Sequence, residues 1–263
     1  NELRHLYTGL SYRHCLMWKT DKDRYDFTRP HDIIGKRIGE YLPKVEDGGA
    51  EFLEIMKKNF DILNHHPVNE ARRARGLKPA NSIWLWSPGK KPQLPDFKEK
   101  WGLNAAVISA VDLIKGIGLC AGMKSIDVEG ATGNVHTNYK GKADAAIEAF
   151  ESGYDYVYVH VEAPDECGHR AELENKVLSI ELIDQKILKP VYEYLKDCGD
   201  DFRIMILPDH PTPIVTLTHA SDPVPYMIYH KKGEKENTFT SINEKTASTT
   251  SMLTFNLLFI TVI

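Results

Sequence analysis

The sequence has few cysteines and no paired-cysteine motif. Its four cysteines are spread over 263 residues and none stands in a C-x-x-C spacing; they are Cys15, Cys120, Cys167 and Cys198. A disulfide-stapled scaffold or a cysteine-ligated zinc site needs cysteines that are closer together or more numerous. The cysteine pattern therefore favours free thiols in a reducing compartment, and we expect the cytoplasm.

Long apolar runs and an excess of one charge sign are also absent. The formal net charge is -4 and the sequence pI is about 6.3, which gives no long-range field to recruit nucleic acid or an anionic membrane. The apolar tail Met252–Ile263 is shorter than the roughly 20 residues that span a bilayer, so it is predicted to be a packing helix or strand. Any phosphorylated substrate must therefore be held by locally placed cations.

Residues 1–88 are predicted to form one α+β unit. Tyr12–Trp18 and Ile83–Trp86 have the composition of strands, and Ala50–Asn64 has apolar side chains at helical spacing. The stretch Ser87–Pro92, rich in proline, glycine and lysine, is the best candidate for a linker. Because the chain begins at Asn1, without methionine and inside a strand-and-turn pattern, the sequence predicts a piece of a longer protein.

Residues 89–263 alternate between strand and helix patterns. We expect strands at 105–109, 125–128, 154–161, 203–207 and 225–229, and helices at 111–120, 142–151 and 173–191, the last bent or broken at Pro190. This alternation predicts an α/β fold with a mostly parallel sheet and helices on both faces.

Metal-ligand side chains follow the apolar strands of this second part. Asp165 and His169 come just after the strand at 154–161, and their spacing of four places them on one face of a helix. Asp209 and His210 directly follow the strand at 203–207, and His219 lies further along. Capping residues and turns would explain any one pair alone. Three such segments together predict a site for two metal ions at the carboxyl edge of the sheet.

Other polar residues carry weaker signals. We expect His160, inside a strand, to be buried, and the exposed pair His65–His66 to be solvated. Cys167 stands between two predicted ligands but should point away from them, and thiolate suits an oxygen and nitrogen site poorly. The basic run at Arg72, Arg73 and Arg75 could hold a phosphate or simply be a solvated helix face, and Lys115 could contact an anion at the sheet edge.

Several motifs together resemble one known family. The motifs are Asp-Glu-x-Gly-His at 165–169, Asp-His-Pro-Thr-Pro at 209–213 and Thr-His before Pro-Val-Pro at 218–225, with further likeness at 12–14, 30–36, 66–69, 80–86, 108–118 and 130–134. They resemble the alkaline phosphatase superfamily, and more closely the archaeal-type cofactor-independent phosphoglycerate mutases. The likeness covers nearly the whole chain.

The resemblance implies a metal-binding α/β core, residues 89–263, and a substrate-covering cap domain, residues 1–88. It implies an isomerase of glycolysis that interconverts 3- and 2-phosphoglycerate through a phosphoserine. Asp165, His169 and His219 would hold one divalent ion and Asp209 and His210 another, with Mn²⁺ expected and Zn²⁺, Mg²⁺ or Co²⁺ as alternatives. The resemblance matches Lys115 to a lysine on the substrate phosphate, and it makes Arg13, Arg72 and Arg75 candidates to bind the substrate.

The sequence departs from the family pattern at its start. Members of the family carry an aspartate ligand and the nucleophilic serine before the cap, and neither has a counterpart here, so turnover by this chain alone is not expected. A phosphatase, a phosphopentomutase or a proposed homoserine kinase would use the same ligands. A non-catalytic metal-binding domain is a further alternative, and homo-oligomerisation stays open.

Overall fold

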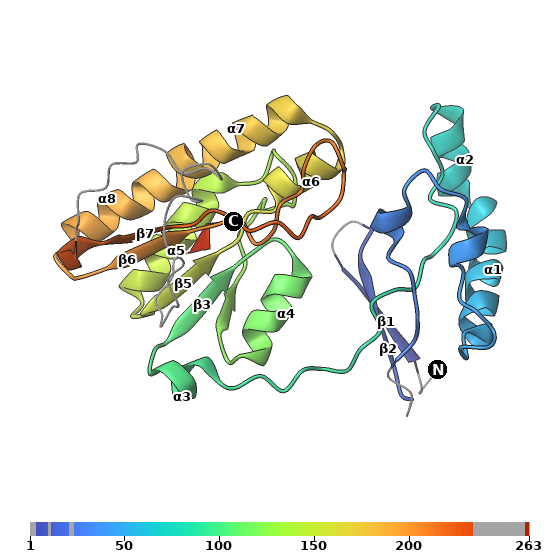
Figure 1. The fold of residues 1–263 in the computed structure, drawn as a ribbon, viewed down its shortest axis with the longest axis horizontal. Coiled ribbons are helices and arrows are strands. Elements are labelled where there is room, and N and C mark those ends of the chain that lie inside the picture. The colour runs from blue at the N-terminus through green and yellow to red at the C-terminus, as the bar shows by residue number, and fades with distance from the viewer. Residues whose placement is uncertain (1–3, 10–11, 21–23, 234–260, 263) are drawn as a thin grey trace. The chain divides into compact units, whose positions relative to one another are not determined.

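The computed structural model describes residues 4–9, 12–20, 24–233 and 261–262, and these form two compact units (Figure 1). The first unit comprises residues 1–6 and 16–91, and the second comprises residues 7–15 and 92–263. The predicted roles of cap and core for residues 1–88 and 89–263 stay predictions. The predicted tail at Met252–Ile263 lies outside the described residues, apart from the short strand β8, Thr261–Val262.

The first unit is built around an aromatic cluster on α1. Phe52 is almost fully buried on this helix, and the rings of Trp18, Tyr25 and Phe27 lie 4.4–4.8 Å from it. Such packed rings stabilise a small unit beyond the area they bury. The elements that the first unit contains or shares are β1 (Arg4–Thr8), β2 (His14–Trp18), η1 (Pro30–Ile33), η2 (Ile38–Tyr41), α1 (Ala50–Asn64) and α2 (Pro67–Ala74).

The second unit is organised by a mostly parallel sheet. The strands lie in the order β4-β3-β5-β8-β6-β7, and among the described strand pairs of this sheet only β6–β7 is antiparallel. Their bounds are β3 (Ala105–Ile108), β4 (Lys124–Ile126), β5 (Tyr156–Val159), β6 (Arg203–Ile206) and β7 (Met227–His230). The predicted strand at 225–229 is therefore shifted by two residues at its start.

Helices cover both faces of this sheet. Val107 of β3 faces α4, where a Cβ on Gly118 would stand 2.5 Å from the Val107 side chain. Its neighbours Ala106 and Ile108 point the other way, into a core shared with α5 and α8. Because successive strand residues face opposite sides, α4 and α5 lie on opposite faces (Figure 1), which confirms the predicted fold class. The helices are α3 (Phe97–Trp101), α4 (Asp112–Cys120), α5 (Tyr139–Glu151), α6 (Ala163–His169), α7 (Leu173–Ile183) and α8 (Lys189–Asp197).

One local prediction was wrong. Ile83–Trp86 forms no strand, and the indole nitrogen of Trp84 donates to the carbonyl of Thr28 instead. The helix predicted at 173–191 is interrupted just before Pro190 by a π-helical segment, η3 (Asp184–Leu188), and Pro190 lies in the first turn of α8, a position that suits proline.

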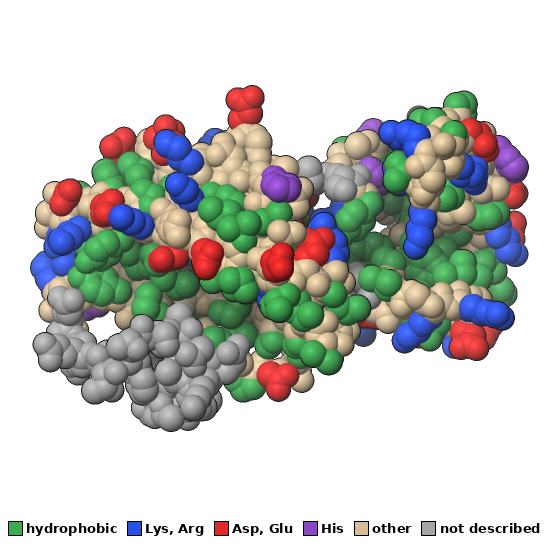
Figure 2. Space-filling view, turned by 90° about the horizontal axis from the view of Figure 1, so that it is seen from above, with side chains coloured by type: hydrophobic (Ala, Val, Ile, Leu, Met, Phe, Trp, Pro, Cys, Tyr) green, Lys and Arg blue, Asp and Glu red, His purple; other side chains and the backbone are tan. Residues whose placement is uncertain are grey.

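The described surface offers no extended single-sign patch on the face drawn in Figure 2. Acidic and basic side chains are interspersed with apolar ones over the second unit. None of the helices among the described residues is both long and apolar enough to cross a lipid bilayer.

Candidate metal centre

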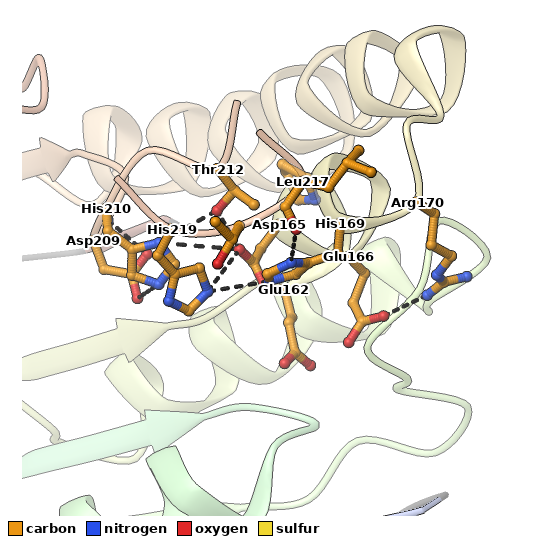
Figure 3. Close-up of polar contacts among 12 residues, drawn as sticks. Glu162, Asp165, Glu166, His169, Arg170, Asp209, His210, Thr212, Leu217 and His219 are labelled. Atoms are coloured by element: carbon orange, nitrogen blue, oxygen red, sulfur yellow. Dashed lines mark hydrogen bonds and ion pairs between the residues drawn. The ribbon is translucent and has the colours of Figure 1, made fainter. Parts of the chain in front are cut away.

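The carboxyl edge of the sheet leads directly into the candidate site. β5 ends at Val159, and α6 begins four residues later with Pro164 in its first turn, a position that suits proline. Asp165 and His169 are one turn apart on α6, so their side chains project on the same side (Figure 3). The loops after β6 bring Asp209, His210 and His219 to the same place.

One group of donors consists of Asp165, His169 and His219. The Nε2 atoms of His169 and His219 are 3.1 Å apart. The carboxylate of Asp165 lies 3.4 Å from the His169 Nε2 and 3.5 Å from the His219 Nε2. Two imidazole nitrogens at such a distance require either a proton or a cation between them. The three groups therefore form a compact nitrogen and oxygen donor set.

The ring of His169 is held in one orientation. Its Nδ1 lies 2.8 Å from the backbone carbonyl of Leu217. A carbonyl oxygen can only accept, so Nδ1 carries the proton and Nε2 keeps its lone pair on the side of Asp165 and His219. This arrangement, in which the second ring nitrogen donates to a carbonyl, is the usual support of a metal-bound histidine. Burial and the neighbouring His210 lower the pKa of His219, which favours its neutral form.

The second group is Asp209 with His210. The Nε2 of His210 lies 3.2 Å from the Asp209 carboxylate, and the His210 ring packs at 3.8 Å between centroids on the ring of His219. Ligand atoms of Asp165, His210 and His219 all lie within 4.8 Å of one another. The two groups are thus neighbours, and Asp165 and His219 lie close to both.

This donor set fits divalent metal ions. Imidazole nitrogens and carboxylate oxygens bind such ions at about 2.0–2.2 Å, which places tetrahedral ligand atoms about 3.4 Å apart. The separations of 3.1–3.5 Å around Asp165 match that spacing. Cys167 is not part of the set: its buried thiol points toward Glu172, and burial raises the thiol pKa, which disfavours a thiolate ligand.

An ion-pair network adjoins the start of α6. Arg13 contacts the carboxylates of Glu162 and Glu166 at 3.1 and 3.2 Å, and Glu166 also pairs with Arg170. Burial raises the pKa of Glu162 to about 7 although Arg13 opposes the shift. Its other carboxylate oxygen is buried with no hydrogen-bond partner among the described residues. Arg13 belongs with the second unit, and the structure gives it carboxylate partners.

A buried polar cluster lies beneath the site. Lys142 of α5 is fully buried, and its ammonium donates to the carbonyl of His160 at 2.6 Å. Burial lowers the pKa of Lys142 to about 8 and that of His160 to about 4. The His160 ring contacts the hydroxyl of Ser109 at 3.1 Å. His160 is buried as predicted. The burial of Lys142 was not predicted, because lysine in an amphipathic helix is normally exposed.

Lys115 lines a cavity of about 310 Å³ near the end of β3. The cavity is bounded by Thr8, Gly9, Ser109, Ala110, Asp112, Lys115, Val128 and Ala131. The Lys115 ammonium donates to Asp127 at 2.6 Å, but Asp127 is largely exposed, so the pair is weak and the ammonium can exchange its partner for an anion. In the first unit, Arg72 donates to the carbonyl of Lys78 and Arg75 is exposed.

Comparisons with known proteins match the chain to metalloenzymes and phosphoglycerate mutases. A family model described as the Metalloenzyme superfamily matches residues 32–257. A 2,3-bisphosphoglycerate-independent phosphoglycerate mutase of Methanothrix thermoacetophila is 49% identical over 223 residues, which cover 85% of this chain and 56% of that protein. A probable enzyme of the same name from Geobacter sulfurreducens is 44% identical over 247 residues, covering 94% of this chain and 61% of that protein.

A solved structure agrees with these relatives at the level of the fold. The PH0037 protein from Pyrococcus horikoshii has a TM-score of 0.60 and 31% sequence identity, over 81% of this chain and 54% of that one. The chain therefore spans little more than half the length of these relatives.

Proposed function

Because the chain belongs to the metalloenzyme superfamily, we propose that it carries the metal-binding part of a 2,3-bisphosphoglycerate-independent phosphoglycerate mutase. The observation that carries this proposal is the convergence of two carboxylates and three imidazoles from three sheet-edge segments, at separations that suit shared divalent ions. The names of the relatives give the substrate class. A cytoplasmic location and a small phosphorylated substrate belong to the same proposal.

We assign two divalent ions, with Mn²⁺ as the expected metal. Asp165, His169 and His219 would hold one, and Asp209 and His210 would contribute to the other. When bound, such ions supply positive charge that lowers the pKa of a coordinated hydroxyl and neutralises phosphoryl oxygens. The chain's own residues orient the donors: the Leu217 carbonyl keeps the His169 Nε2 lone pair on the side of the site, and burial lowers the pKa of His219, which favours its neutral form.

Lys115 is proposed to hold the phosphate of the substrate. Its ammonium lines a cavity whose volume, about 310 Å³, lies at the lower end of the range for small-molecule pockets. A three-carbon phosphoester is a substrate of that size class. Arg72 and Arg75 stay candidates for contacts from the cap, which would exclude water so that the phosphoryl group returns to the glycerate rather than to water. Arg13, which pairs with Glu162 and Glu166, is the weakest of the three arginine candidates.

The activity can be tested in a chimera. This chain would replace the matching segment of the Methanothrix thermoacetophila enzyme, to which it is 49% identical. We expect the chimera to convert 3- to 2-phosphoglycerate with Mn²⁺ and without added 2,3-bisphosphoglycerate. An Asp209→Asn version, which keeps the side-chain volume but removes a ligand charge, should lose at least about 100-fold in rate.

The outcomes separate the alternatives. A folded, metal-loaded chimera that only hydrolyses phosphoglycerate would indicate a phosphatase and reject the mutase assignment. A chimera that acts on another phosphorylated compound but not on phosphoglycerate would indicate a different member of the superfamily. A folded chimera that binds Mn²⁺ but has no activity, beside an active parent enzyme, would support a non-catalytic metal-binding domain.

A further inference from the structure

Thr212 joins the two groups of donors through a single hydroxyl. The residue lies in the loop after β6 and is 5% exposed. Its Oγ1 donates to the Asp165 carboxylate and lies 3.3 Å from the Nδ1 of His210 (Figure 3). Asp165 belongs to one proposed ion and His210 to the other. The hydroxyl is thus placed between a ligand from α6 and a ligand from the β6 loop.

The protons at this junction can be assigned from donor and acceptor chemistry. A hydroxyl has one proton, and an ionised carboxylate can only accept. The Thr212 proton therefore goes to Asp165, and the contact with His210 requires that Nδ1 of His210 donate to Oγ1. Nδ1 of His210 therefore carries a proton, which leaves Nε2, 3.2 Å from the Asp209 carboxylate, as the ring nitrogen that would bind an ion.

Lys176 ties together the backbone segments that carry these ligands. Its ammonium, from α7, donates to the carbonyl of Pro164 at 2.9 Å and to the carbonyl of Thr212 at 3.2 Å. Pro164 precedes Asp165 in the first turn of α6, and Thr212 follows His210 by two residues. The half-buried Lys176 ammonium thus holds together the start of α6, which carries Asp165, and the loop after β6, which carries His210.

We propose that Thr212 and Lys176 are positioning residues of the metal centre: the hydroxyl orients the His210 ring and the Asp165 carboxylate, and the ammonium holds their backbones in register. The inference rests on the proposed metal site and deepens it. Hydrogen-bonded supports of this kind orient metal ligands, and their loss commonly weakens metal binding 10- to 100-fold.

Thr212→Val tests the hydroxyl, because valine keeps the shape of threonine and removes its oxygen. We expect the Mn²⁺ affinity of the chain, measured by calorimetric titration, to fall on the order of 10- to 100-fold. Thr212→Ser, which restores the hydroxyl, should recover most of the affinity. Thr216→Val is the matched control, because the exposed Thr216 hydroxyl donates to the carbonyls of Pro213 and Thr218 and to no proposed ligand in the part of the chain that the structure describes. The affinity of this variant should equal that of the wild type.

A second readout needs no metal. Nitrogen-detected histidine spectra of the metal-free chain should show a proton on Nδ1 of His210 in the wild type and in Thr212→Ser. In Thr212→Val the Nδ1 proton should be lost from part of the population, because its acceptor is gone while the Asp209 carboxylate still accepts from Nε2. A threonine that served only for packing would leave the Nδ1 proton of His210 unchanged.

Lys176→Met provides the parallel test for the ammonium. It should weaken Mn²⁺ binding, and Lys176→Arg should restore part of it. Lys189→Met is the control, because Lys189 is exposed and its ion pair with Glu193, at 4.0 Å, is long and lies on the surface.

The possible results are distinguishable. Wild-type affinity and an unchanged His210 tautomer in Thr212→Val, in a chain that does bind Mn²⁺, would overturn this inference and leave the proposed function standing. A wild-type chain that binds no Mn²⁺ at all would overturn the proposed metal centre and this inference with it.

Discussion

Replacing Asp165 by alanine is expected to abolish tight Mn²⁺ binding by this chain. Among the described residues, Asp165 is the carboxylate that pairs with all three imidazoles, at 3.4 Å from His169, 3.5 Å from His219 and 4.0 Å from His210. Removing it leaves neutral rings without the negative charge that offsets the dehydration of a divalent ion. We expect the Mn²⁺ affinity to fall by more than about 100-fold, since removing a direct ligand weakens metal binding more than removing a residue that only orients a ligand.

The measurement is a Mn²⁺ titration followed by calorimetry or by the electron paramagnetic resonance signal of free Mn²⁺. Asp144→Ala is the matched control: it removes the same charge from a surface pair with Lys140 on α5, and its affinity should be that of the wild type. An Asp165→Ala chain that bound Mn²⁺ as tightly as the wild type would show that the ion binds elsewhere.

Adding one methyl group at Gly168 is expected to damage the same site without touching a ligand. Gly168 lies on α6 between Asp165 and His169, and a Cβ there would stand 2.5 Å from the carbonyl oxygen of Thr212 and 3.0 Å from the Lys176 ammonium. The carbonyl belongs to the backbone of the loop that carries Asp209 and His210. That loop must move away from α6 to admit the methyl group, and the two groups of donors separate.

Gly168→Ala should therefore lower the free energy of unfolding by about 1–3 kcal/mol, the usual cost of overpacking. Its Mn²⁺ affinity should fall at least about 10-fold, because the connection between β6 and β7 carries three of the proposed ligands, Asp209, His210 and His219. The control is Gly116→Ala in α4, where an added Cβ meets no atom within 4 Å. It should raise stability by about 0.5–1 kcal/mol through the better helix propensity of alanine. Unchanged stability and affinity in Gly168→Ala would contradict the close packing of loop and helix.

Helix α1 and the strand ends next to Asp165 and Asp209 were predictable because their signals are local, whereas α3 was not predicted. The bounds predicted for α1, Ala50–Asn64, are those observed, since the apolar spacing of that segment is helical throughout. The predictions that Asp165 and Asp209 follow strands rested on short apolar runs next to them, and β5 and β6 do precede them. Each of these patterns lies within a short stretch of sequence, so it can be recognised without knowledge of the fold.

The supports of the site were not predictable, because each is made by partners far apart in the chain. Thr212 contacts Asp165 across 47 residues, and Lys142 reaches the carbonyl of His160 across 18. The composition of either segment suggests a solvated threonine and a surface lysine. Only the fold, which brings α5, α6 and the β6 loop to one sheet edge, assigns them buried partners.

The missing strand at Ile83–Trp86 has a related cause. Its alternating aromatic and aliphatic residues have strand propensity, but propensity is satisfied only where another strand offers a ladder. Here the neighbouring backbone amide of Ala80 donates to the side chain of Asn69, and the Trp84 indole donates to Thr28. Polar groups in and next to this segment are therefore hydrogen-bonded to partners elsewhere in the first unit, and not to a neighbouring strand.

The most direct test of the metal centre is a crystal of this chain grown with Mn²⁺, with diffraction measured at the manganese absorption edge. An anomalous peak is predicted within about 2.3 Å of the Asp165 carboxylate and of the Nε2 atoms of His169 and His219, with a second ion near Asp209 and His210. Anomalous peaks only elsewhere on the molecule, with these five side chains free of metal, would contradict the assignment.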